Sequence, residues 1–138
     1  MATLKTNTLT GTSTAGSIAV TGEGNSTTTN LQQGLAKCWV QFDGTASGAA
    51  ARDSLNVSSM TDNGTGDYTI NINNDMANDD YSLVTTAGHD DAGGTAHSFE
   101  THNYATGSVT ANLFTITNVA VGKADRQFVH ATFHGDLA

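Results

Sequence analysis

The stretch DNGTGDYTINI, residues 62–72, places a turn signal directly before an alternating strand. Asn-Gly at 63–64 adopts positive φ at low cost and is a strong short-range signal for a β-hairpin. Tyr68, Ile70 and Ile72 then alternate with polar residues, and a period of two is the spacing of a half-buried strand. The stretch therefore predicts an antiparallel hairpin and favours an all-β chain.

The segments on both sides of this hairpin repeat the pattern. Cys38, Val40 and Phe42 alternate with polar residues and with Trp39, as a strand with one apolar face would. Other strands are expected at 54–58, 81–86, 98–106, 109–116 and 127–134. Turn signals separate these segments and amphipathic patterns of helix length are absent, so we expect an antiparallel β-sandwich, a jelly-roll-like knob.

The apolar residues of the segment 109–116 change phase. Val109, Ala111 and Leu113 share one parity, whereas Phe114 and Ile116 take the other. A phase change within a strand predicts a β-bulge or a bend between sheets.

Residues 1–35 differ from the rest and are expected to form an extended arm, followed by the sandwich domain at 36–138. Thr occupies every second position from 6 to 14, which is strand spacing, but the opposite face is too poor in apolar residues for a core. Ile18 and Val20 predict a second short strand, residues 22–30 a loop, and residues 31–37 one helical turn. We expect pairing with other subunits to order this arm.

The composition favours an oligomer. The 138 residues suffice for one domain plus an arm, but only 37% are hydrophobic and 13% charged. A thin core raises the need for a partner chain to complete the burial of apolar surface. The chain has no Pro to protect edge strands, so short strands or subunit contacts must protect them.

The charge and the apolar pattern exclude several partners. A formal net charge of −8 repels phosphate backbones, so nucleic acid is not expected as a partner. No apolar run approaches the ~20 residues of a membrane span, and residues 1–10 do not resemble a signal peptide. The single Cys38 excludes an intrachain disulfide. We expect a protein that is made in a host cytoplasm and assembled into something larger.

Four motifs follow one another between residues 34 and 81. They are AKCWVQFDGT at 36–45, RDSLNVSS at 52–59, TDNGTGDYTIN at 61–71, and the loop at 76–81. Together they resemble a domain found near the carboxyl end of tail-fibre and minor structural proteins of marine tailed bacteriophages. The resemblance covers about one third of the chain. It implies a β-sandwich knob on a homotrimeric fibre of the virion, with attachment or structure rather than catalysis as its role.

The candidate receptor-binding residues lie in and after a Gly-rich segment at 87–96. A long loop is costly to order without a use, so we expect it to be displayed to a host surface glycan or protein. Residues 73–80 join it in this expectation. The candidate residues are His89, Asp90, Asp91, His97, Phe99, His102 and Tyr104.

Metal and cofactor sites are not expected. His130 and His134 share a strand face, but a spacing of four in a strand places them roughly 13 Å apart, which makes them weak metal candidates. The acidic stretch at 62–67 lacks the Glu and the spacing of an EF-hand, and hairpin chemistry explains it with fewer assumptions. Trp39 is read as packing between sheets or subunits, with sugar stacking as the alternative.

No motif for catalysis is present, so an enzyme is not expected. The chain lacks a nucleophile elbow and a phosphate loop, and Cys38 has the pattern of an inert core thiol. The function that we predict is that of a small homotrimeric tail-fibre or appendage subunit, with residues 1–35 docking on other virion proteins. The alternatives are a head-decoration (cement) protein of the capsid and a carbohydrate-binding module.

Overall fold

The computed structural model describes residues 3–12, 18–22, 27–88, 96–116 and 121–138. Contacts within the chain form two units, an arm at Met1–Leu35 and a domain at Ala36–Ala138. The two units are described separately.

The arm contains a short hairpin and one helical turn. Strand β1 (Ala19–Thr21) pairs antiparallel with β2 (Thr28–Asn30), and α1 (Leu31–Gly34) follows. The Asn30 side chain caps α1 by accepting a hydrogen bond from the Gln33 N–H. None of the described arm residues is buried.

The arm corrects two sequence predictions. The Thr row was expected to form a strand, but residues 3–12 contain no strand. The Thr6 hydroxyl instead donates a hydrogen bond to the Thr8 carbonyl oxygen. Such local bonds between side chain and backbone compete with strand pairing. Thr28–Asn30, expected in a loop, forms β2 because Ala19–Thr21 lies opposite it. The strand near Val20 and the helical turn are confirmed.

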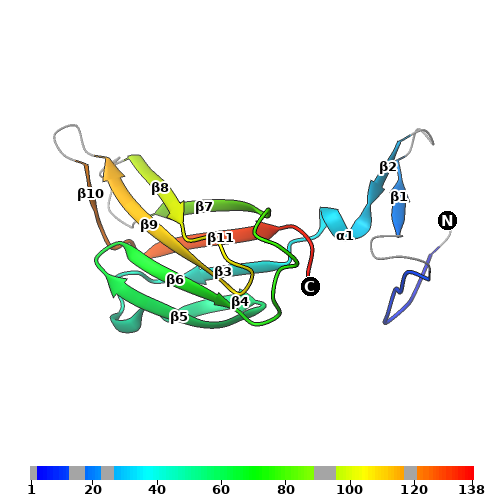
Figure 1. The fold of residues 1–138 in the computed structure, drawn as a ribbon, viewed down its shortest axis with the longest axis horizontal. Coiled ribbons are helices and arrows are strands. Elements are labelled where there is room, and N and C mark those ends of the chain that lie inside the picture. Colours follow the sequence, from blue (N-terminus) through cyan, green and yellow to red (C-terminus); the bar gives the residue numbers. More distant parts are fainter. Residues whose placement is uncertain (1–2, 13–17, 23–26, 89–95, 117–120) are drawn as a thin grey trace. The chain divides into compact units, whose positions relative to one another are not determined.

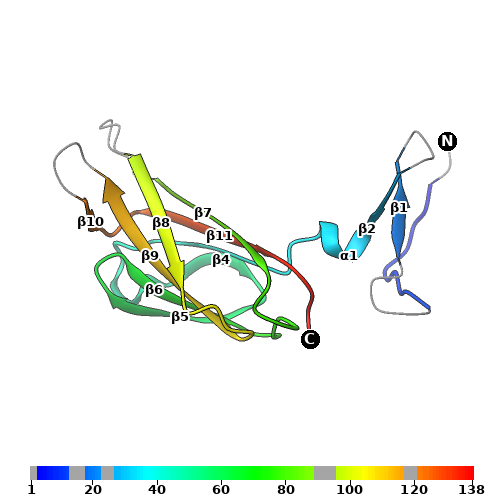
Figure 2. The same ribbon diagram turned by 45° about the horizontal axis from the view of Figure 1, so that its top comes forward.

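The domain contains two antiparallel sheets, seen as two layers in Figures 1 and 2. The β3–β11 sheet has the order β4-β3-β11-β7. In the β6–β9 sheet, β5 pairs with β6, and β6 and β10 pair with successive parts of one edge of β9. β8 pairs with the opposite edge of β9. The first comprises β3 (Cys38–Phe42), β4 (Ala51–Leu55), β7 (Ser82–Gly88) and β11 (Phe128–His134). The second comprises β5 (Val57–Gly64), β6 (Asp67–Ile72), β8 (Ala96–His102), β9 (Ser108–Ile116) and β10 (Val121–Lys123). A short 3-10 turn, η1 (Ser47–Ala49), precedes β4.

The core lies between these sheets. Alternate residues of β3, β6 and β11 are buried, as the sequence predicted. Phe42 of one sheet meets Tyr68 of the other edge to face, with ring centroids 4.9 Å apart. Large side chains that are fully buried include Val40, Ile70 and Phe133. Both sheets therefore bury one face in a shared core and leave the other face outward.

The segment expected as one strand at 54–58 is two strands. Asn56 takes a left-handed φ of 59° and separates β4 from β5, which belong to different sheets. The Asn56 amide nitrogen donates to the carbonyl oxygens of Lys37 and Asn74, and its side-chain oxygen accepts from the Asn74 N–H. Asn tolerates this conformation better than other non-glycine residues, so the alternation continues across a turn.

The hairpin at 62–72 is confirmed, with β5 and β6 as its arms. The positive φ values fall on Gly64 (127°) and Gly66 (64°). The bulge expected within 109–116 is wrong, because β9 pairs with β6, β8 and β10 without a shift in register. Register shifts occur instead in the β3–β4 and β5–β6 pairs.

Candidate interaction surface

A row of side chains crosses the outward face of the β3–β11 sheet. Val84 lies opposite Thr132, Thr132 lies opposite Trp39, and Trp39 lies opposite Leu55. Strand neighbours of Trp39, Thr132 and Val84 belong to the core or pack against it, so these three side chains face away from the core. Leu55 is exposed and lies opposite Trp39 in the β3–β4 pair. Together the four side chains form what we call the apolar row, which spans all four strands of the sheet.

The apolar row is open to solvent at both ends. Val84 is 58% exposed and Leu55 is 47% exposed, while Trp39 and Thr132 are partly buried. Single exposed apolar residues are common on proteins, but a contiguous row on a flat sheet marks a contact surface. An aromatic residue between aliphatic ones is typical of the centre of a protein interface.

A polar row runs beside the apolar row, two residues along each strand. Thr86, His130, Gln41 and Asp53 lie opposite one another across β7, β11, β3 and β4. They supply hydroxyl, imidazole, amide and carboxylate groups next to the indole of Trp39. The face thus combines an apolar centre with a hydrogen-bonding rim.

Charged groups fix one border of this face. The Arg52 guanidinium lies 4.8 Å from the centroid of the Phe128 ring and pairs with the Asp43 carboxylate at 2.5 Å. The pKa of Asp43 lies below its ordinary value. The main cause is the hydrogen bond that its carboxylate accepts from the Thr45 hydroxyl, and the nearby Arg52 adds to it.

The outward face of the β6–β9 sheet is different, because its described side chains bond one another. The Asn71 amide donates to the hydroxyls of Ser59 and Thr61 at 3.0 and 3.3 Å. The Asn63 amide donates to the Thr69 hydroxyl at 2.9 Å. Polar groups that bond internally have less to gain from a partner. The β3–β11 sheet is therefore the better candidate for a contact surface.

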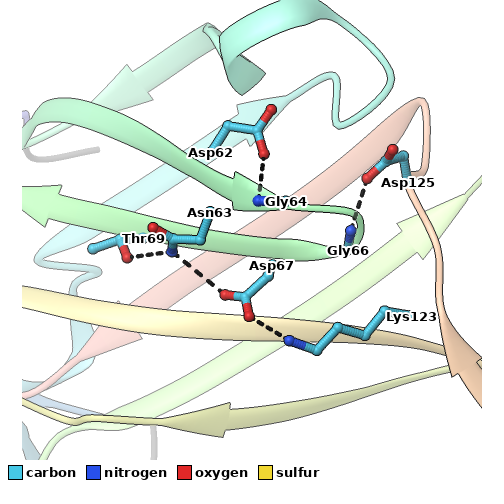
Figure 3. Close-up of polar contacts among 8 residues, drawn as sticks. All are labelled: Asp62, Asn63, Gly64, Gly66, Asp67, Thr69, Lys123 and Asp125. Atoms are coloured by element: carbon cyan, nitrogen blue, oxygen red, sulfur yellow. Dashed lines mark hydrogen bonds and ion pairs between the residues drawn. The ribbon is translucent and has the colours of Figure 1, made fainter.

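The end of the β5–β6 hairpin is held by carboxylates, as Figure 3 shows. Asp125 accepts from the Gly66 N–H at 2.7 Å and from the Tyr68 hydroxyl at 2.6 Å. Lys123 donates to Asp67, and this bond keeps the pKa of Asp67 below its ordinary value. Burial, with Asp125 close by, raises the pKa of Tyr68. These bonds fasten the segment after β10 to the hairpin, which is a structural role.

The expected receptor residues do not form one cluster among the described residues. His89, Asp90 and Asp91 lie outside the described part of the chain. His97 lies in β8 opposite Thr115. Phe99, also in β8, is partly buried and packs against the core.

His102 and Tyr104 lie at the other end of β8, which at ~3.3 Å per residue is roughly 20 Å from Ala96. His102 is partly buried and is a minor cause of the lowered pKa of Asp67. Tyr104 is 39% exposed and packs on Tyr81, with ring centroids 5.3 Å apart. The segment 73–80 is mostly exposed, and its Asn78 side chain caps a turn at Asp80.

The weak metal candidates lie on β11, where His130 is exposed and His134 is partly buried. Within the described ranges, no three His, Cys, Asp or Glu side chains are grouped to hold a metal ion. Cys38 is buried, and burial raises its thiol pKa to about 12. Such a thiol is a core group and a poor nucleophile.

Leu55 and Val84 were not singled out from the sequence. Each lies in a segment that was expected to be a strand, but the order of strands in the sheet decides that both flank Trp39. That order is set by contacts distant in sequence, which alternation does not reveal.

In the described residues no helix is long and apolar enough to cross a membrane. No family model matches the chain, and comparisons with curated proteins and with solved structures find no match.

Proposed function

We propose that the chain is a non-enzymatic structural protein of a tailed-phage virion, a small homotrimeric tail-fibre or appendage subunit. The apolar row on the β3–β11 sheet is the observation that carries this proposal. Leu55, Trp39 and Val84 present apolar surface outward, on the side of the sheet opposite the buried core. Covering that surface with a second copy removes it from water, which stabilises the complex by about 25 cal/mol per Å² of apolar surface buried.

The finer fold that we propose is a jelly-roll-like β-sandwich knob. Two sheets with one shared core support the sandwich, and pairing of the domain's first strand with its last, β3 with β11, supports the jelly-roll winding. β5–β6 and β8–β9 are local hairpins between consecutive strands.

The arm and the domain have different roles in this proposal. The arm docks on sister copies or other virion proteins, because none of its described residues is buried and Leu4, Leu9, Val20 and Leu35 are exposed. In this proposal residues 89–95, which lie outside the described part of the chain, contact a host glycan or protein. The protein is made in the host cytoplasm and works on the particle.

The mass of the purified chain in solution tests the homotrimer. Light scattering over a concentration series is expected to give three times the 14.2 kDa of one chain. Leu55→Asn is expected to raise the dissociation constant about tenfold or more, since removing a buried Leu contact costs roughly 1.5–3 kcal/mol. Leu137→Asn, the same exchange at an exposed leucine outside the apolar row, is the matched control. A monomeric wild type at every concentration refutes the homotrimer.

Labelled particles decide between tail and head. A gold-tagged chain at the tail in electron micrographs supports the appendage, whereas labels over the capsid support a head-decoration protein.

One observation favours the carbohydrate-binding alternative, because Trp39 lies beside the polar groups of Gln41 and His130. A monomer whose glycan affinity is lost in Trp39→Ala would establish that alternative instead.

A further inference from the structure

Two edge strands of the domain flank a hollow. Among the described strands, β4 is the edge of one sheet and β5 is the edge of the other. Between them lies a hollow of about 350 Å³, which we call the edge hollow. A cavity of ~150 Å³ already holds a benzene-sized group, so this one has room for a leucine side chain. It is lined by Gly48, Ala50, Ala51, Ser54, Val57, Ser58, Ser59 and Met60.

The two faces of β5 differ in chemistry. Ser59 and Thr61 lie on the outward face, where both accept hydrogen bonds from Asn71. Val57 and Met60 pack toward the core and line the edge hollow. A strand added beside β5 would therefore need hydroxyls or amides on one face and an apolar side chain on the other.

The arm segment 6–12 has this pattern and pairs with no strand among the described residues. Thr6, Thr8, Thr10 and Thr12 share one parity, and Leu9 lies on the other between Asn7 and Gly11. Residues 3–12 are exposed throughout and form no strand. The same residues have the alternation of a strand, so the sequence encodes pairing that this single chain does not provide.

We propose that the arm segment 6–12 of a second copy adds as a strand to the β5 edge and places Leu9 in the edge hollow. The Thr row then continues the hydroxyl and amide rows of Ser59, Thr61 and Asn71 across the outward face. Backbone hydrogen bonds supply affinity, and the hollow supplies register, as in other strand additions.

A second copy is the fitting occupant because it brings one arm for every edge. If each arm passes to the next copy around the proposed homotrimer, no β5 edge stays exposed, and a chain without Pro needs such protection for its edge strands. This inference rests on the proposed homo-oligomer and names the contact that links its copies.

Disulfide capture between two chains that each carry one added cysteine tests the contact, because the native Cys38 is buried. Leu9→Cys and Ala50→Cys full-length chains are mixed, oxidised and run on a non-reducing gel. A cross-linked dimer is expected in the mixture. Leu9→Cys mixed with Thr86→Cys, on the outward face of the other sheet, is expected to give at least tenfold less cross-link.

A second variant measures the contribution of Leu9. Leu9→Asn is expected to raise the dissociation constant about tenfold to a hundredfold, because a buried leucine contact is lost. Leu4→Asn, the same exchange at an arm residue of the Thr parity, is expected to change it less than threefold.

The outcomes separate this inference from the proposed function. Wild-type trimers with no Leu9–Ala50 cross-link, or with Leu9→Asn and Leu4→Asn alike, overturn the arm contact and leave the homotrimer standing. A Leu9→Cys/Ala50→Cys double variant that cross-links only within one chain overturns the second copy as occupant. A wild type that is monomeric throughout overturns both proposals.

Discussion

Replacing Tyr68 by Phe removes one hydroxyl from a fully buried side chain near the end of the β5–β6 hairpin. That hydroxyl lies 2.6 Å from a carboxylate oxygen of Asp125 and 3.0 Å from the Gly44 carbonyl oxygen. The ring keeps its edge-to-face contact with Phe42, so the change isolates the hydrogen bonds from the packing.

The expected loss of stability is about 2 kcal/mol. A hydrogen bond to a charged group contributes ~1.5–3 kcal/mol, and removing one partner leaves the other to be resolvated. Asp125 is partly exposed and keeps its bond from the Gly66 N–H, which places the cost below the top of that range. For a domain of this size, ~1 kcal/mol shifts Tm by about 4–8 °C, so Tyr68→Phe is expected to lower Tm by about 10 °C.

Thermal unfolding followed by circular dichroism, together with urea titration, measures this loss. Tyr104→Phe is the matched control, because its hydroxyl bonds Thr101 in an exposed pair and its loss is expected to cost less than ~0.5 kcal/mol. Equal stability of the Tyr68→Phe variant and the wild type would show that the Asp125 bond contributes nothing, and the account of the hairpin end would be wrong.

Three further predictions concern the domain. The hydrogen bond from Lys123 keeps the pKa of Asp67 in the folded protein below its ordinary 3.8. The stability that the Asp67 carboxylate contributes is therefore present above pH 3.8 and is lost as the pH falls through the folded pKa. In acid titrations, the stability of Asp67→Asn should fall less steeply below pH ~4 than that of the wild type. Cys38, with its pKa raised to about 12, should resist iodoacetamide at pH 8 until denaturant is added, and fast labelling of native protein would contradict its burial. Gly135→Ala should cost about 1–3 kcal/mol in urea titration, since a Cβ there would lie 2.9 Å from the Tyr81 Cβ; an unchanged midpoint would mean that the neighbouring loop yields freely.

The strands that cross the core were predictable from alternation. Cys38, Val40 and Phe42 in β3 and Val129, Ala131 in β11 have the pattern that burial on one face requires, and all five are buried. The period of two reports which side of a strand faces the core and is independent of the partner strand.

The crossing between the sheets was not predictable from this pattern. Leu55 and Val57 keep the same parity on both sides of Asn56, so alternation alone continues through a residue that reverses the chain. Leu55 ends on an outward face and Val57 packs against the core. Only the tendency of Asn toward the left-handed region marks such a point in the sequence.

The candidate surface was predictable in its centre and not in its extent. From the sequence, Trp39 was expected to pack between sheets or subunits, with sugar stacking as the alternative, and the structure places it partly buried on the outward face. Val84 and Leu55 joined it only through strand pairing, which depends on contacts of long sequence separation. The expected display residues divided for the same reason, since Phe99 turned inward to the core while Tyr104 packed on Tyr81.

The single-residue connection at Asn56 couples the unfolding of one sheet to that of the other. No spare loop length separates the last residue of β4 from the first of β5, and the Asn56 side chain also binds backbone at Lys37 and Asn74. If one sheet separates from the other, the hydrogen bonds of Asn56 break, and the strand that follows Asn56 is displaced as well. Amide protons of β3 and β6 should therefore exchange with solvent through the same global opening, in step rather than layer by layer.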